Sequence, residues 1–194
     1  MIVAISQPEH FPYEGFFQKM HQCDLFVLLD DVQFSGPRSY QNRNRFLNPR
    51  GELEWFGVAV AKGSYSSLLK DVCTSEDKVW RRKVARTLFF RYGFDFSEIY
   101  SHEKLCDINI AGIEFLRDKL NIKTQIILSS ELNCPGRKSE KLANICKALG
   151  ASTYLCGSGG KEYLDKNIFG DILIEYHKPN VRSMMTALDL LKVR

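Results

Sequence analysis

Residues 1–31 read MIVAISQPEHFPYEGFFQKMHQCDLFVLLDD, and the elements that they predict form the first unit of an α/β sheet. Residues 2–5 form a continuous apolar run rich in β-branched side chains, which predicts a buried strand. A proline suited to the first helical turn and apolar residues at helical spacing predict a helix over residues 12–22. Residues 25–29 form a second buried strand. The order strand, helix, strand predicts a right-handed βαβ unit with parallel strands.

Polar side chains follow both strands: Gln7, His10 and Tyr13 follow the first, and Asp30 and Asp31 follow the second. Because parallel strands end on the same edge of a sheet, we expect these groups on one edge. The two carboxylates are candidate ligands of a divalent metal, or one is a general base. Alternatively, one caps the next turn and the other pairs with an arginine from the segment 38–45. His10 is a candidate acid–base group or a hydrogen-bonded structural residue.

A basic segment, RSYQNRNR, follows and ends at Arg45. In an extended conformation Arg43 and Arg45 lie on one face with Gln41, while Asn42 and Asn44 lie on the other. Planar guanidinium groups suit bidentate contacts with phosphate or carboxylate. The segment is therefore a candidate anion-binding strand, and the alternative is a solvated edge strand.

A glycine-rich turn, Gly157-Ser158-Gly159-Gly160, follows a predicted strand over residues 152–156, and Lys161 opens a predicted short helix over residues 161–165. Glycines allow a phosphate to approach backbone N–H groups closely, and the lysine adds a cation. The turn matches neither common phosphate-binding pattern. It is either a phosphate cradle or a plain tight turn.

Two cysteines are candidate nucleophiles only if a base lies beside them. They are Cys156, next to the glycine-rich turn, and Cys23.

The remaining periodicity completes an α/β pattern. The segment 75–92 predicts a helix with Ser75 as its N-cap and Gly93 as its terminator. Strand and helical patterns elsewhere alternate, so we expect a mostly parallel, Rossmann-like sheet with helices on both faces. Residues 1–194 are expected to form one domain with a helical insertion at about 75–121. The other predicted strands are 54–60, 68–72, 124–128 and 171–176, and the other predicted helices are 103–120 and 139–149.

Composition narrows the class of protein. The formal net charge is +4, which is compatible with an anionic small ligand and too small to indicate nucleic acid. The six cysteines are expected to be reduced, because the core is large enough without bridges. The apolar start is a strand and not a signal peptide, and no run is long enough to span a membrane, so we expect a cytoplasmic protein.

The motifs Q-P-E-H-F-P-Y-E-G-F-F, D-L-F-V-L-L-D-D-V-Q-F and Q-N-R-N-R occur in order from Gln7 to Arg45. Later motifs are G-R-K-S-E-K-L, then I-C-K-A-L-G-A-S-T-Y-L-C-G, and A-L-D-L-L. Together these resemble the WbqC-like family over nearly the whole chain. The family's motif positions correspond to Gln7, Pro8, Pro12, Gly15, Asp30, Asp31, Gln41, Asn42, Arg43, Asn44, Arg45, Lys138, Glu140, Gly157 and Tyr163.

The resemblance implies a role in bacterial O-antigen and surface-polysaccharide biosynthesis. It favours a transferase acting on a nucleotide-linked sugar or phosphorylated carrier, including acyl or aminoacyl transfer to an amino sugar. Alternatives are a non-catalytic binding or complex-organising protein and a nucleotidyltransferase-like enzyme, although the paired-histidine motif of the latter is absent. His10 stands where many relatives have an aromatic residue, and the segment 176–188 is short. The sequence identifies no cofactor, metal or oligomeric state.

Overall fold

The computed structural model describes residues 1–192, which form two compact units. Unit 1 contains residues 1–7, 15–30 and 122–181, and unit 2 contains residues 8–14, 31–121 and those from 182 onward. The expectation of one domain over the whole chain stays a prediction. Within residues 1–192, every helix is too short or too polar to cross a lipid bilayer.

Unit 1 is built on a five-stranded sheet in the order β5-β2-β1-β6-β7, with every neighbouring pair parallel. This confirms the predicted α/β fold with a parallel sheet. The strands are β1 (Ile2–Ser6), β2 (Leu25–Leu28), β5 (Gln125–Leu128), β6 (Thr153–Cys156) and β7 (Leu173–Tyr176). The helices are α1 (Glu14–His21), α4 (Ser129–Leu132) and α5 (Lys138–Ala148).

The strand order reverses beside β1. The chain runs outward from β1 to β2 and β5, then returns to place β6 on the other side of β1 and β7 beyond it. Helix α1 connects β1 to β2, and α5 lies in the connection that returns in the opposite direction across the sheet to β6. Because such crossovers are right-handed, the two helices belong to opposite faces of the sheet. Ligands of doubly wound sheets bind beyond the carboxyl ends of the strands at such a reversal.

The central strand β1 is buried on both faces, as its continuous apolar sequence requires. Phe16, Phe17 and Met20 of helix α1 are all buried. The Phe16 ring centre lies 5.1 Å from that of Phe26 in β2. The apolar residues that predicted the helix therefore include the one that packs α1 against β2 in the first βαβ unit.

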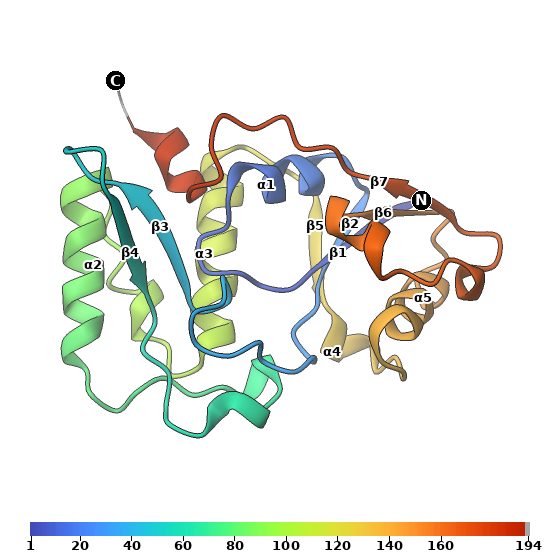
Figure 1. The fold of residues 1–194 in the computed structure, drawn as a ribbon, viewed down its shortest axis with the longest axis horizontal. Helices are drawn as coiled ribbons and strands as arrows, with labels where there is room; N and C mark the ends of the chain where they lie inside the picture. Colours follow the sequence, from blue (N-terminus) through green and yellow to red (C-terminus); the bar gives the residue numbers. More distant parts are fainter. Residues whose placement is uncertain (193–194) are drawn as a thin grey trace. The chain divides into compact units, whose positions relative to one another are not determined.

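Unit 2 contains an antiparallel hairpin and two long helices (Figure 1). The hairpin packs on α2 (Val79–Tyr92) through Phe46, whose ring centre lies 6.3 Å from that of Tyr92. A buried aromatic cluster centred on Phe11 contacts Phe56 of the hairpin and Phe96. The elements are β3 (Arg43–Leu47), β4 (Leu53–Gly57), α2 (Val79–Tyr92) and α3 (Leu105–Lys119).

Three local predictions need correction. The segment 68–72 is not a strand, because a 3-10 turn, Leu69–Asp71, occupies it. Helix α2 begins at Val79 and not after Ser75, because the Asp77 carboxylate accepts the Val79 N–H at 2.9 Å. The glycine-rich turn is itself a 3-10 turn, Ser158–Glu162, so no α-helix starts after it.

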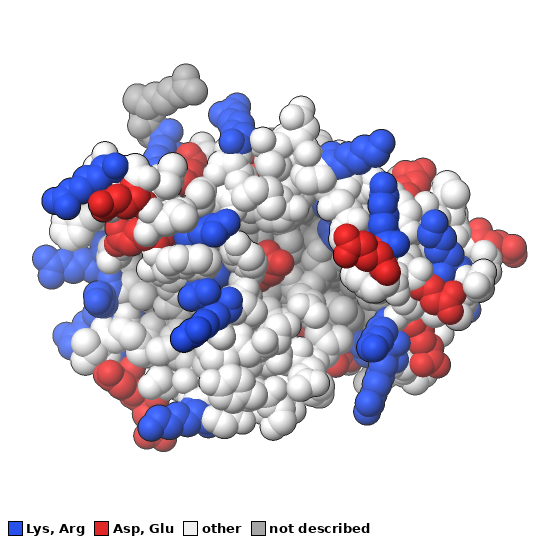
Figure 2. All heavy atoms as spheres, in the orientation of Figure 1, with Lys and Arg blue, Asp and Glu red and all other residues white. Residues whose placement is uncertain are grey.

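The terminator of α2 is confirmed: Gly93 has φ 77°, the left-handed conformation that ends helices. All six cysteines are free thiols. On the face shown in Figure 2, lysine and arginine side chains are mixed with acidic ones over much of the surface.

Candidate functional site

The carboxyl end of β1 in unit 1 holds a buried cation. Lys19 of α1 is almost fully buried, and its Nζ donates to the Ile5 carbonyl at 2.9 Å and to the Ser6 hydroxyl. An ammonium group is rarely buried without such acceptors. The charge therefore sits at the strand reversal, where doubly wound folds bind ligands.

The glycine-rich turn leaves β6 on the other side of that reversal. Gly160 packs so closely that a Cβ there would lie 2.1 Å from the Cys156 Sγ, so only glycine fits. Burial raises the pKa of the Cys156 thiol, which keeps it protonated. The Lys161 Nζ lies 5.2 Å from the centre of the Tyr176 ring. Within residues 1–192, the N–H groups of Ser158 and Gly159 make no hydrogen bond.

A buried histidine follows β7. The Nδ1 of His177 lies 3.0 Å from the Gln22 Oε1, and its Nε2 is buried without a partner in the described residues. Burial is the main cause that lowers the pKa of His177, and the nearby Lys19 charge lowers it further. The imidazole is therefore neutral near physiological pH.

Asp30, at the end of β2, is 2% exposed, and its carboxylate accepts hydrogen bonds from the first residues of α4. Its Oδ1 accepts from the Ser129 Oγ at 3.0 Å and the Ser130 N–H at 2.9 Å. Its Oδ2 accepts from the Ser130 Oγ at 2.6 Å. These bonds tie Asp30 to the start of α4, far along the chain, and not to the next turn that the capping alternative named. A catalytic role for Asp30 stays a prediction.

The other predicted residues of unit 1 lie at loops and helix ends. Gln7 is half-buried directly after β1. Lys138 begins α5 with φ 50°, and both it and Glu140 are exposed. A Cβ on Gly136 would lie 2.8 Å from the Glu140 Cγ, so this carboxylate folds back over the turn before the helix.

In unit 2, His10 is completely buried. Its Nδ1 lies 3.1 Å from the Asn109 Oδ1, and its Nε2 lies 3.0 Å from the Tyr100 hydroxyl. Burial lowers the pKa of His10 from 6.5 to about 4, so the ring is neutral at physiological pH. Its catalytic role stays a prediction, and the contacts are those of a core histidine.

The amide side chains of the basic segment form hydrogen bonds with backbone groups of neighbouring segments. Asn44 is 1% exposed, and its Nδ2 donates to the carbonyls of His10 and Phe11 at 3.2 and 2.8 Å. Asn42 donates to the Val58 carbonyl at 3.2 Å. The Gln41 Oε1 accepts the Ser35 N–H at 2.7 Å. Their predicted ligand contacts are untested, and each has a structural role.

The arginines of the same segment lie on the opposite face of β3. The Arg43 guanidinium carbon is 4.0 Å from the centre of the Trp55 ring, and that of Arg45 is 5.3 Å from it. The Arg45 group also lies 5.9 Å from the centre of the Tyr40 ring. In the described residues neither guanidinium has a carboxylate partner, and both Nε atoms are buried without a hydrogen bond. We call Tyr40, Arg43, Arg45 and Trp55 the arginine–tryptophan platform.

The hairpin register creates this platform. Arg45 stands opposite Trp55, and Arg43 stands opposite Gly57. A Cβ on Gly57 would lie 2.3 Å from the Asn42 carbonyl oxygen, so glycine is required there. The missing side chain gives Arg43 room to lie over the diagonal neighbour Trp55.

Two predicted residues of unit 2 remain. Asp31 is half-buried and interacts with another residue. The backbone of Tyr13 forms an isolated antiparallel bridge with Thr186. Burial and the Glu9 charge raise the pKa of Tyr13. Residues 1–192 contain no group of three or more His, Cys, Asp or Glu side chains able to hold a metal ion.

Sequence reasoning missed three residues that organise these regions: Lys19, Trp55 and Asn109. Trp55 was detectable, because the turn residues Asn48-Pro49-Arg50-Gly51 between two alternating segments predict a hairpin. No local pattern marks Lys19 or Asn109, because the partners of Lys19 lie in the preceding strand and those of Asn109 lie in distant segments. The Asn109 Nδ2, for example, donates to the carbonyls of Pro8 and Gln41 at 2.9 and 2.6 Å.

Comparison with known proteins identifies a family. The model of the WbqC-like protein family matches residues 7–184. A protein of Mycobacterium tuberculosis named "Uncharacterized protein Rv1507c" is 28% identical over 185 residues, covering 89% of this chain and 79% of its own. No solved structure is significantly similar to the chain.

Proposed function

The chain belongs to the WbqC-like protein family, and on that premise we propose that it is a transferase of bacterial surface-polysaccharide biosynthesis. Its substrate is a nucleotide-linked sugar or a similar anionic molecule, and the group moved includes acyl or aminoacyl groups placed on an amino sugar. The single observation that carries this proposal is the arginine–tryptophan platform of unit 2.

Two positive charges on one strand face need an explanation. Residues two apart on a strand are separated by about 7 Å, so the guanidinium groups repel each other. In the described residues no carboxylate compensates them. Stacking on Trp55 orients both groups and leaves their outer N–H donors for a ligand. A phosphate or diphosphate has the charge and the oxygens to satisfy them.

The aromatic members of the platform suit the uncharged part of such a ligand. Trp55 and Tyr40 are each 41% exposed, and their ring centres are 6.3 Å apart. Exposed ring faces stack on sugars and nucleobases, and base stacking contributes about 1–3 kcal/mol per base. A nucleotide-linked sugar combines the two features, a ring and a phosphate.

Unit 1 supplies independent support. The buried Lys19 charge and the N–H groups of Ser158 and Gly159 lie at the edge of the sheet where doubly wound folds bind anionic ligands. Rate enhancement would come mainly from positioning and charge stabilisation.

A second candidate function is non-catalytic binding in the same pathway. The observation that favours it is that two predicted catalytic residues, Asp30 and His10, are hydrogen-bonded within the fold. The Asp30 carboxylate accepts three hydrogen bonds, and both ring nitrogens of His10 have partners. This candidate predicts binding without turnover.

A thermal-shift panel tests the proposal, with nucleotide sugars, nucleotides, acyl-CoA species, amino acids and divalent metals as probes. A ligand at about 100 times its Kd stabilises the folded state by about 2.7 kcal/mol, which is readily detected. We expect a shift with a nucleotide sugar that is lost in Arg43→Ala and kept in the control Arg50→Ala. Absence of a shift with every anionic probe contradicts the proposal.

Turnover separates the two candidates. The probe that binds is incubated with an amino-sugar acceptor, and products are followed by mass spectrometry. A new covalent product supports the transferase, whereas a saturable shift with no product over a range of acceptors supports the binding protein.

A further inference from the structure

The solvent face of α2 carries an unusual combination of residues. Helix α2 (Val79–Tyr92) has five basic residues and no acidic one. Two of the five are used internally: Arg81 donates to the carbonyls of Tyr100 and His102, and Arg91 contacts Asp189. The other three are Arg82, Lys83 and Arg86.

These three side chains have no ion pair or hydrogen bond from their charged groups to any described residue. They form one stripe along the helix, because residues three and four apart share a face. The opposite face, with Ala85, Leu88 and Tyr92, is buried. The stripe therefore points away from the core of unit 2.

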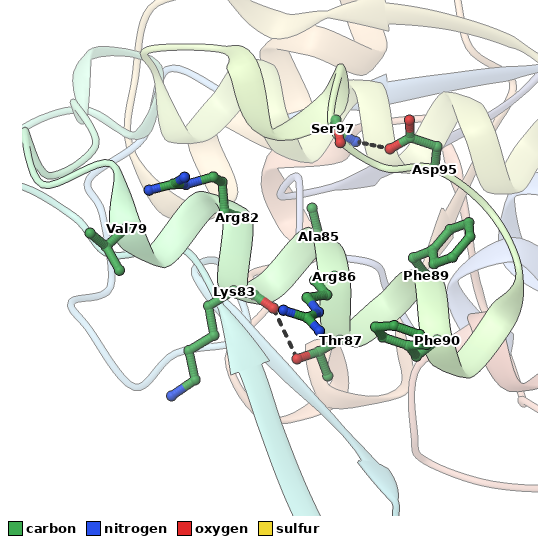
Figure 3. A pocket seen from close by; sticks show the side chains of 10 residues that line it. All are labelled: Val79, Arg82, Lys83, Ala85, Arg86, Thr87, Phe89, Phe90, Asp95 and Ser97. Atoms are coloured by element: carbon green, nitrogen blue, oxygen red, sulfur yellow. Dashed lines mark hydrogen bonds between the residues drawn. The ribbon is translucent and has the colours of Figure 1, made fainter.

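Large apolar side chains stand at both ends of this stripe. Val79 is at one end, and Phe89 and Phe90 are at the other, with the cations between them (Figure 3). Phe90 is 72% exposed, and the Arg86 guanidinium lies 5.4 Å from the centre of its ring. In Figure 2, basic side chains gather along the edge where Figure 1 places α2.

The stripe borders an open groove of about 930 Å³. The groove's acidic residue is Asp95, which accepts the Ser97 N–H at 2.8 Å. Among the charged residues lining the groove, three are cations and one is an anion. The surface therefore favours an anionic partner.

We propose that the solvent face of α2 docks on an anionic phospholipid surface, with Phe89 and Phe90 entering the headgroup–acyl boundary and Arg82, Lys83 and Arg86 contacting lipid phosphates. Membrane-surface helices combine apolar rings that enter the headgroup–acyl boundary with cations that attract anionic lipids. The apolar face of α2 is buried in unit 2, so Phe89 and Phe90 supply the rings here. Each basic residue near an anionic leaflet adds attraction, and the attraction falls within a Debye length. The exposed apolar side chains at the ends of the stripe, Val79 at one and Phe89 with Phe90 at the other, explain why a lipid surface fits better than a purely ionic partner.

Vesicle co-sedimentation of the full chain tests the proposal. The probes are vesicles of phosphatidylcholine alone and vesicles in which part of this lipid is replaced by phosphatidylglycerol. We expect sedimentation with the anionic vesicles, weakened by added salt, and little with the neutral ones. The double variant Arg82→Gln/Arg86→Gln should lower partitioning by at least about tenfold.

Matched variants separate docking from general attraction. Arg50→Gln/Lys62→Gln removes the same charge from exposed positions elsewhere in unit 2, and it should leave partitioning within about twofold of the parent if the face is specific. Phe90→Ala should weaken binding while leaving the melting temperature unchanged, because the ring is exposed. Equal losses in both double variants, or no preference for anionic vesicles, overturn the proposal. The proposal is also overturned if the parent protein self-associates through this face, as shown by loss of self-association in Phe90→Ala, and does not bind vesicles.

Discussion

The guanidinium of Arg43 lies 4.0 Å from the centre of the Trp55 indole ring, across the hairpin from one strand to the other. This pair fixes the orientation of a charge that has no carboxylate partner among the described residues. The sequence shows that the basic segment is polar. The structure shows which of its residues hydrogen-bond within the fold and which lie on the outer face of the hairpin.

Replacing Arg43 by lysine keeps the charge and removes the planar stacking group. We expect the affinity for the anionic ligand found in the thermal-shift panel to fall by roughly tenfold, because lysine neither stacks on Trp55 in this way nor offers a bidentate fork. Calorimetric titration measures the change. The control Arg50→Lys, in the hairpin turn, should bind as the parent does. A large loss of thermal stability with unchanged affinity would instead assign Arg43 to the fold.

Gly160→Ala should destabilise the protein by about 1–3 kcal/mol, because the added Cβ would lie 2.1 Å from the Cys156 sulfur. The double variant Gly160→Ala/Cys156→Ala removes that sulfur and should recover part of the lost stability. Urea unfolding of both single variants and the double variant gives the coupling energy. If the two losses simply add, the close contact is not what excludes alanine.

Asp30→Ala should lower the free energy of unfolding by about 2–4 kcal/mol. It removes the acceptor of three hydrogen bonds from Ser129 and Ser130 and leaves buried donors unsatisfied. Asp30→Asn retains one oxygen acceptor and should cost less. Chemical denaturation measures both. A variant that unfolds like the parent yet loses all activity would restore Asp30 as a catalytic group.

The buried His10 should make stability depend on pH. Its pKa is lowered from 6.5 to about 4 by burial, so between these values the unfolded chain binds a proton that the folded protein does not. The free energy of unfolding is therefore highest above pH 6.5 and decreases as the pH falls toward 4. Each pKa unit corresponds to about 1.4 kcal/mol, so the full loss is about 3 kcal/mol.

His10→Gln keeps hydrogen-bonding groups for Asn109 and Tyr100 and cannot titrate. Its urea-unfolding free energy should vary less with pH over this window than that of the parent. The lowered pKa of His177 adds a dependence of the same sign, which both proteins share. Parallel pH profiles for the two proteins would show that His10 is not the titrating group.

The parallel sheet of unit 1 could be predicted from local sequence patterns. Runs such as residues 2–5 and 25–29 are short and apolar at every position, which is the pattern of parallel strands buried on both faces. The alternation along β3 could also be predicted, because side chains of a strand point to opposite faces in turn, whatever surrounds them. Both are local properties of the chain.

The role of each face of β3 could not be predicted from the sequence, because it depends on how the folded chain packs. Asn44 is buried and bonds the carbonyls of residues 10 and 11, whereas Arg43 lies over Trp55. The same holds for Lys19 and Asp30, whose partners are the end of β1 and the start of α4. Burial and hydrogen-bond partners depend on residues far away in the chain, so periodicity identifies the polar groups and the packed fold assigns their roles.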